Sequence, residues 1–149
     1  MVISTRRATI DDLDALVPLF DAYRQFYKQP SDPDLARGFL RERFEHAQSI
    51  IFIAEEAGSA LGFTQLYPSF SSTRAARIFV LNDLFVAPAG RKRGVGAALL
   101  AAAADYGRGA GAVELGLSTA RTNLTAQSLY EAHGWQRDDV FLSYDLSLT

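Results

Sequence analysis

The sequence predicts an α/β fold in a single domain. Strand-like and helix-like stretches follow one another along the 149 residues in the order β-α-α-β-β-β-α-β-α-β, a pattern typical of a sheet covered by helices. Apolar residues make up 48% of the chain and charged residues 21%, as in an ordinary globular protein. Because no repeat, linker or low-complexity stretch interrupts the chain, residues 1–149 are predicted to form one domain.

Local signals predict the first strand and the first two helices. Residues 2–9 hold several β-branched side chains, which favour a strand. Thr9 and Asp12 form a start like a capping box, and apolar side chains then recur at helical spacing. Pro18 lies inside that helical pattern, so a kink or a break is expected there. An Asp-Pro pair at 32–33 places a capping residue before a first-turn proline and predicts the second helix.

The middle of the chain predicts three strands that pair as an antiparallel meander. The stretches "SIIFIAEE" and "LGFTQLYPSF" are joined by "AGSA", which indicates a hairpin. The third strand, "RIFVLNDLFVAP", ends at Pro88. An alanine-rich helix follows Gly94 and ends in the glycines of "GRGAGA". The remaining predictions are a strand at "VELGLST", a helix at "NLTAQSLYEAHG" with an Asn cap and a terminal Gly, and a final strand at "VFLSYDLSL".

Charge and residue content exclude several classes of function. The net charge of −2 argues against nucleic acid or an anionic membrane as a partner. The chain has no cysteine and only two histidines, far apart, so no metal site is expected. The longest uncharged apolar stretch, residues 94–104, is far shorter than the ~20 residues that span a bilayer. With no apolar leader at the N-terminus, these features favour a reducing, cytoplasmic setting.

Three cations stand where a helix disfavours them. Arg91, Lys92 and Arg93 open the alanine-rich helix, although the N-terminus is the positive end of the helix dipole. A multiply charged anion bound on this turn would make them favourable, and Gly94 and Gly96 would let it approach the backbone. The alternative is a solvated basic loop beside a routine helix. The residues after Gly96 fit neither a nucleoside-triphosphate loop nor a dinucleotide fingerprint.

Two blocks of residues resemble one enzyme family. The string Arg91-x-x-Gly94-x-Gly96, directly after "LFVAP", resembles the acetyl-CoA pyrophosphate loop of the GCN5-related N-acetyltransferases. The string Asn123-x-x-Ala126-x-x-Leu129-Tyr130-Glu131-x-x-Gly134-Trp135 resembles a second block of that family. The order of elements also agrees, so the resemblance covers essentially the whole chain.

The resemblance implies a mixed, mostly antiparallel sheet with helices on both faces. Its two central strands, near 78–87 and 113–118, would splay apart around acetyl-CoA. The family usually has a glycine where this chain has Lys92. The residues implied to bind the cofactor are Leu84, Phe85 and Val86 through their backbone, Arg91, Lys92, Arg93, Gly94, Val95, Gly96 and Ala97 around the pyrophosphate, and Asn123 and Ala126.

The resemblance also assigns the proton donor. Tyr130 would protonate the departing CoA thiolate as a general acid, and the alternative is that Tyr130 is a core residue of an amphipathic helix. The general base is left open. Related polyamine and small-amine acetyltransferases have a Glu where this chain has Asn82, so either a water takes the proton or the amine arrives neutral. Alternation along a strand predicts that Asn82 and Asp83 point to opposite faces, with Asp83 structural.

The acceptor is predicted to be a small-molecule amine. By resemblance, Tyr23, Arg24 and Asn82 fall where acceptor contacts are made, whereas Phe26 is expected to pack in the core. Arg24 and Asn82 stand where acidic residues are expected for a polycation, so an amine that carries an anionic group, such as an amino-acid-like compound, is favoured.

Two other functions compete with this interpretation. One is an acetyltransferase acting on a protein or on aminoacyl-tRNA, and the other is a non-catalytic acyl-CoA-binding regulatory domain. A homodimer is expected, because the final strand carries aromatic side chains, Phe141 and Tyr144, that can pair across an interface.

Overall fold

A computed structural model describes residues 2–149. The chain forms two compact units, with the boundary in the sequence between Ser118 and Thr119. The first unit is built on a five-stranded sheet in the order β1-β2-β3-β4-β5. Neighbouring strands are antiparallel except β4 and β5, which are parallel. The strands are β1 (Ser4–Arg7), β2 (Ile50–Glu56), β3 (Ser59–Ser71), β4 (Ala76–Val86) and β5 (Leu115–Gly116).

The predicted meander is confirmed, and a two-residue turn sets its first register. β2 and β3 are joined by Ala57 and Gly58, with φ of 51° and 77°. Two successive positive φ angles are those of a type I′ turn, whose twist matches that of a hairpin. The turn pairs Glu56 with Ser59, and a β-bulge at Leu61 then shifts the register, so that Ala54 pairs with Gly62.

The helices begin where the capping signals predict. The short 3₁₀ helix η1 (Ile10–Asp12) has a capping box between Thr9 and Asp12 and leads directly into α1 (Leu13–Phe26). Asp32 accepts a hydrogen bond from the Leu35 amide at the start of α2 (Pro33–Glu45). The remaining helices of the first unit are η2 (Pro88–Gly90) and α3 (Val95–Gly109).

Helix α1 continues through Pro18, so no break occurs there. A proline inside a helix costs about 3 kcal/mol because it removes a donor and crowds the preceding turn. The face of α1 around the proline buries Leu16, Val17, Leu19 and Phe20. Burying each large apolar side chain contributes roughly 1.5–3 kcal/mol, so the packing of this face outweighs the cost of the proline.

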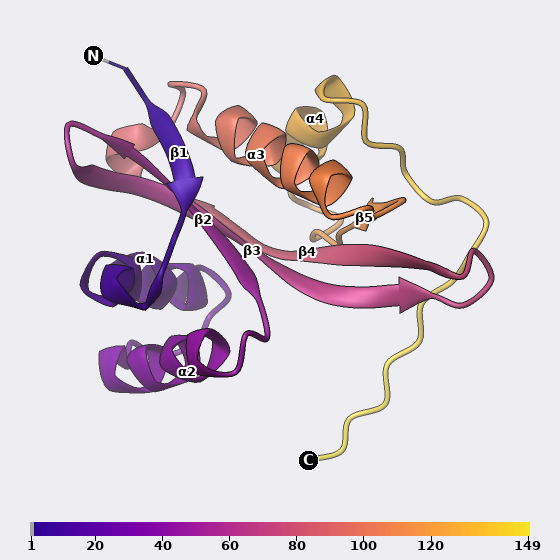
Figure 1. Cartoon of the computed structure of the whole chain (residues 1–149), viewed down its shortest axis with the longest axis horizontal. Helices are drawn as coiled ribbons and strands as arrows, with labels where there is room; N and C mark the ends of the chain where they lie inside the picture. The colour runs from indigo at the N-terminus through magenta and orange to yellow at the C-terminus, as the bar shows by residue number, and fades with distance from the viewer. Residues whose placement is uncertain (1) are drawn as a thin grey trace. The chain divides into compact units, whose positions relative to one another are not determined.

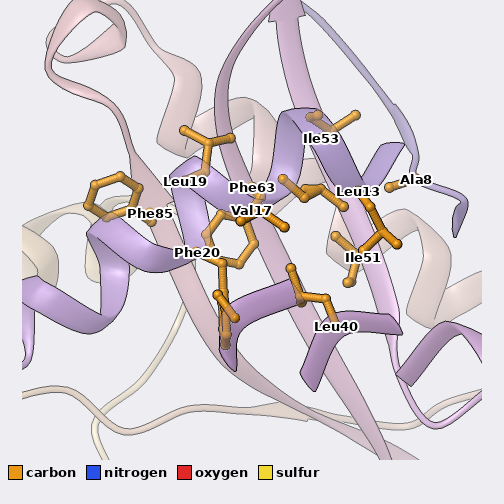
Figure 2. Close-up of a cluster of buried hydrophobic side chains, with 12 residues drawn as sticks. Ala8, Leu13, Val17, Leu19, Phe20, Leu40, Ile51, Ile53, Phe63 and Phe85 are labelled. Atoms are coloured by element: carbon orange, nitrogen blue, oxygen red, sulfur yellow. The ribbon is translucent and has the colours of Figure 1, made fainter. Parts of the chain in front are cut away.

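Helices α1 and α2 cover one face of the sheet and α3 covers the other (Figure 1), with a buried apolar cluster on each face. On one face, side chains of α1 and α2 pack against Ile51, Ile53 and Phe63 of the sheet, as Figure 2 shows. On the other face, Val95 and Leu99 of α3 pack against Ala54 and Leu61. The sheet is therefore covered by helices on both sides, as the sequence predicts.

The second unit differs from the prediction at its end. Its helix α4 (Leu124–Ala132) begins at the Asn123 cap and is followed by Gly134 with φ of 89°, both as predicted. The prediction of a final strand at 140–148 is wrong, because these residues form no strand and are exposed throughout. Alternating apolar residues become a strand only beside another strand, and none pairs with them in the described structure.

Candidate functional site

The loop between β4 and α3 holds a glycine-like conformation at a lysine. Lys92 has φ of 60° and Gly94 has φ of 80°, so both lie in the left-handed region. Gly94 adopts this conformation freely, whereas a residue with a side chain does so at a cost of roughly 1–2 kcal/mol. The lysine therefore keeps the backbone shape that a glycine would favour at this position, and it adds a positive charge to the loop.

The same loop presents three backbone amides at the start of α3. The first intrahelical hydrogen bond runs from the Ala98 amide to the Gly94 carbonyl, at 3.0 Å. The amides of Val95, Gly96 and Ala97 precede it, and Gly94 as N-cap offers no side-chain acceptor. A Cβ added to Gly94 would meet no atom within 4 Å, so the turn is open on that side. Unpaired amides at the positive end of a helix attract anions.

The three cations of the loop have different partners. Arg91 Nε donates to the Val86 carbonyl at 3.1 Å and ties the loop to the end of β4. Arg93 forms an ion pair with Glu56 of β2. Within residues 2–149, the exposed Lys92 ammonium has no hydrogen-bond or ion-pair partner. Two of the three cations thus hold the loop in place, and Lys92 is the charge that remains for a ligand.

Strand β4 has an edge without a strand partner beside this loop. It pairs with β3 from Ala76 to Val86 except at Asn82, but with β5 only at Phe79 and Val80. From Leu81 to Val86, no strand of the described structure lies along the other edge. The backbone of Leu84, Phe85 and Val86 therefore lies where a ligand can add to the sheet as a further strand does.

A β-bulge interrupts β4 at Asn82. Gln65 of β3 pairs with Asp83 and Leu66 pairs with Leu81, which leaves Asn82 without an opposite residue. The Asn82 side-chain amide donates to the Asp83 carboxylate at 2.8 Å. The prediction that these two side chains point to opposite faces is therefore wrong, because a bulge suspends the alternation of a regular strand.

Asp83 is the buried centre of a polar network. It is only 2% exposed and accepts a second hydrogen bond from Gln65 Nε2 at 2.5 Å. Gln65 in turn accepts from the Ser49 hydroxyl at 2.7 Å. Burial raises the pKa of Asp83, and burial together with the Asp83 charge raises the pKa of Tyr67 to about 12. These contacts support the predicted structural role of Asp83.

Replacing Asp83 with alanine is expected to lower the free energy of unfolding by about 1–3 kcal/mol. The amide groups of Gln65 and Asn82 would lose their acceptor while Gln65 remains buried. The isosteric control, Asp83→Asn, keeps the shape and one acceptor oxygen, so it should lose less. Urea unfolding followed by circular dichroism measures both variants, and equal loss in the two would contradict the hydrogen-bond explanation.

The free energy of unfolding of the wild type and that of Asp83→Asn should depend differently on pH. Because the pKa of Asp83 is higher in the folded state, the native protein binds more protons than the unfolded chain over a window above the ordinary aspartate pKa of about 3.9. The contribution of this group to stability therefore falls as pH rises through that window. Subtracting the Asp83→Asn unfolding free energies from those of the wild type should give a negative slope there.

Two of the three predicted acceptor residues, Tyr23 and Asn82, contact each other. The Tyr23 hydroxyl donates to the Asn82 carbonyl at 3.1 Å, and its ring packs edge-on against Phe63 and Phe85. Burial, with the charge of Asp83, raises the pKa of Tyr23, so it remains a proton donor. Arg24 instead directs its guanidinium toward the Pro30 carbonyl, at 3.5 Å.

Two side chains of α1 differ from what the pattern indicates. Phe26 is 59% exposed, so the prediction that it packs in the core is wrong. Asp21, which the sequence reasoning missed, is buried and accepts hydrogen bonds from the Ser31 hydroxyl and the Asp32 amide. These contacts tie α1 to the start of α2 and hold the pKa of Asp21 below its usual range. The sequence feature that could have identified Asp21 is a charged residue on the apolar face of a predicted helix.

The second unit contains the other predicted residues within one short helix. Asn123 Oδ1 accepts from the Ala126 amide at 3.1 Å, which confirms the predicted cap. Tyr130 is half-buried, and its ring centroid lies 6.0 Å from that of Trp135. The Tyr130 carbonyl accepts from the amides of His133 and Trp135, which end the helix in a closed turn.

The described residues contain neither a metal-binding cluster nor a membrane-spanning helix. Within residues 2–149, no three His, Cys, Asp or Glu side chains gather in a group that could hold a metal ion. In the same residues, no helix has both the length and the apolar character needed to cross a membrane.

Comparison with known proteins identifies the family. Residues 13–135 match the Acetyltransferase (GNAT) family. The chain is 48% identical over 146 residues to the uncharacterized N-acetyltransferase YhfO of Bacillus subtilis (strain 168), covering 98% of both chains. It is 30% identical over 99 residues to an aminoglycoside N(6')-acetyltransferase type 1 of Klebsiella aerogenes, covering 65% of each. A crystal structure of a probable acetyltransferase superposes with a TM-score of 0.91 at 40% identity, covering 100% of this chain and 99% of that one.

The chain therefore belongs to the GNAT acetyltransferase family, and the mixed sheet with helices on both faces is the fold of that family. It is an acetyl-CoA-dependent N-acetyltransferase.

Proposed function

We propose that this enzyme transfers the acetyl group of acetyl-CoA to a primary amine of a small molecule, by direct attack of the amine on the thioester. The loop from Arg91 to Ala97 carries the proposal. Its left-handed residues Lys92 and Gly94 hold three helix amides open to an anion, and a pyrophosphate has the charge to match. We further propose that residues 1–149 act as one domain, in the cytoplasm, as a homodimer.

We propose the following contacts to the cofactor. The amides of Val95, Gly96 and Ala97 would hold the pyrophosphate, with Lys92 as the available cation. Arg91 and Arg93 would contribute charge from the positions in which Val86 and Glu56 hold them. The backbone of Leu84, Phe85 and Val86 would bind the pantetheine arm along the open edge of β4, and Asn123 and Ala126 would contact the same arm.

Three requirements of acetyl transfer assign the remaining roles. The amine must be neutral, the carbonyl must be polarised, and the thiolate must receive a proton. We propose that Tyr130 supplies that proton as the general acid. Asn82 cannot act as a base, and Asp83 is buried and already accepts two side-chain hydrogen bonds. The amine's proton therefore leaves through water, or the amine arrives neutral.

The acceptor is a small-molecule amine in this proposal. Relatives at 28–30% identity are named aminoglycoside N(6')-acetyltransferases, which favours a small molecule over a protein or aminoacyl-tRNA. Tyr23, Arg24 and Asn82 would contact it. Because Arg24 and Asn82 present no acidic charge, an amine that also bears an anionic group is the preferred acceptor class, and an aminoglycoside is the second candidate.

An acceptor screen that follows CoA release tests both the activity and the acceptor class. Amino acids, polyamines, aminoglycosides and peptides are compared at equal concentration, with a thiol reagent as the readout. Release that depends on a small amine supports the proposal, and release only with peptides would favour a protein substrate. If acetyl-CoA binds and none of the four classes releases CoA, the proposed acceptor class is wrong.

Arg24→Ala is expected to raise KM for a carboxylate-bearing amine by about 10- to 150-fold. This is the scale of one lost hydrogen bond to a charged group, about 1.5–3 kcal/mol. KM for a simple alkylamine should change little, because that acceptor offers Arg24 no anion. Steady-state kinetics with both amines measures the difference. Equal, small changes for both amines, or a wild-type preference for spermidine, would contradict the role of Arg24.

A further inference from the structure

Arg43, near the end of α2, is a mostly buried cation with few partners. Its side chain is 18% exposed, and in the described part of the chain its buried Nε atom has no hydrogen-bond acceptor. Nη2 donates to Glu42 at 2.9 Å, but Glu42 is the neighbouring residue and its side chain is 65% exposed. A buried donor without an acceptor destabilises the folded state, so its presence calls for an explanation other than packing.

A row of aromatic rings links Arg43 to the bulge of β4. Its guanidinium lies over the Phe39 ring, 4.2 Å from the centroid, which fixes the position of the charge. Phe39 stacks on Phe20 with centroids 5.6 Å apart, and Phe20 stacks on Tyr23 at 6.1 Å. The Tyr23 hydroxyl donates to the Asn82 carbonyl at the bulge. Arg43 therefore lies at one end of a row of rings whose other end is the bulge.

Tyr67 is within electrostatic reach of both Arg43 and the polar network at the bulge. Tyr67 follows Gln65 by two residues in β3, so both side chains point to the same face of the sheet, and Gln65 donates to Asp83. The negative charge of Asp83 raises the pKa of the half-buried Tyr67, and the positive charge of Arg43 lowers it. This face of the sheet therefore carries an acidic group at the bulge, a tyrosine hydroxyl, and a cation on α2.

The chemistry of this face favours a carboxylate as the partner of Arg43. A guanidinium presents its N–H groups in one plane, and a carboxylate accepts two such bonds side by side. The Asp83 carboxylate does not fill this role, because it is 2% exposed and bonded to Gln65 and Asn82. An acceptor that carries both charges would place its carboxylate at Arg43, away from Asp83, and its amine toward the bulge.

We infer that Arg43 is a specificity-determining residue that binds the carboxylate of an amino-acid-like acceptor and so directs the amine toward the open edge of β4. This inference rests on the proposed function, to which it adds a second cation, on a different helix from Arg24. The carboxylate would give Arg43 an acceptor that the rest of the described chain does not supply.

Arg43→Met should raise KM for β-alanine and γ-aminobutyrate by about 10- to 150-fold, the scale of one lost hydrogen bond to a charged group. KM for propylamine and butylamine, which have the same lengths without the carboxylate, should stay within a factor of two, as should the affinity for acetyl-CoA. The matched control, Arg41→Met, removes an exposed arginine of the same helix and should leave KM unchanged for every amine. Equal changes for carboxylate-bearing and simple amines would overturn the inference.

Unfolding in urea separates recognition from a role in the fold. Methionine keeps a contact with the Phe39 ring and removes a buried cation, so Arg43→Met should unfold at no lower urea concentration than the wild type. Arg43→Lys keeps the charge and should retain part of the preference for carboxylate-bearing amines. A lower urea midpoint for Arg43→Met, together with equal KM changes for both kinds of amine, would assign Arg43 to the fold and overturn the inference.

Thermal unfolding in the presence of CoA, which has no acetyl group to donate, tests the site independently of catalysis. β-Alanine and γ-aminobutyrate should raise Tm of the wild type and of Arg41→Met but not that of Arg43→Met. If these carboxylates stabilise the wild type in this way but release no CoA from acetyl-CoA, the carboxylate site stands and the proposed acceptor class fails. If simple amines release CoA and neither carboxylate distinguishes the wild type from Arg43→Met, the inference fails and the proposed activity stands.

Discussion

Gly94→Glu should lower the affinity for acetyl-CoA by about 100-fold or more and leave the chain folded. Gly94 is the N-cap of α3, and a side chain built there enters open space beside the three helix amides. A carboxylate in that space would compete for those amides and repel a pyrophosphate. Each hydrogen bond to a charged group contributes about 1.5–3 kcal/mol, and 1.4 kcal/mol is a factor of ten. Isothermal titration calorimetry with acetyl-CoA gives the affinity directly.

Two matched variants separate charge from strain. Gly94→Ala carries the same left-handed backbone strain as Gly94→Glu, with φ of 80°, but it adds no charge. Alanine should therefore destabilise the loop by about 1–2 kcal/mol while it retains most of the affinity. Gly96→Glu lies within α3, where an acidic residue in the first turn is favourable to the helix, and should lose affinity without loss of stability. Unchanged affinity in both Glu variants would end the pyrophosphate interpretation of this turn.

Features with a local cause were predictable from the sequence. The caps at Thr9, Asp32 and Asn123 form because each side chain reaches an amide two or three residues ahead. The hairpin at Ala57 and Gly58 likewise depends on the residues of the turn itself. For such elements, the neighbours in sequence are also the neighbours in space, so their positions follow from pattern alone.

Features that depend on a distant residue were not predictable. The bulge at Asn82 exists because β4 has one residue more than β3 between two paired positions, and alternation along β4 alone does not reveal it. Arg93 looks like a free cation in the sequence, yet Glu56 pairs with it from another strand. Phe26 is the last residue of α1, beyond the helix positions that are buried, and it is exposed.

The prediction of a final strand was wrong for a related reason. Residues 140–148 have the composition and alternation of a strand, but a strand exists only where a partner supplies hydrogen bonds. A single chain provides none in the described structure.

Tyr130→Phe should lower kcat by ~10²–10⁴-fold, the usual contribution of a positioned acid, and keep the affinity for acetyl-CoA near that of the wild type. Phenylalanine retains the ring that packs beside Trp135 and removes only the hydroxyl. A CoA thiol resembles cysteine, with a pKa of about 8.5, so its thiolate leaves faster when a proton is supplied. Stopped-flow or steady-state CoA release with a saturating amine measures kcat, and calorimetry measures the affinity.

The control for this variant is Tyr106→Phe, which removes the hydroxyl of a half-buried tyrosine on α3 whose ring packs against Phe79. It should leave kcat within a factor of two. If Tyr130→Phe kept kcat within a factor of two, the role of Tyr130 would be packing against Trp135, and the thiolate would take its proton from water.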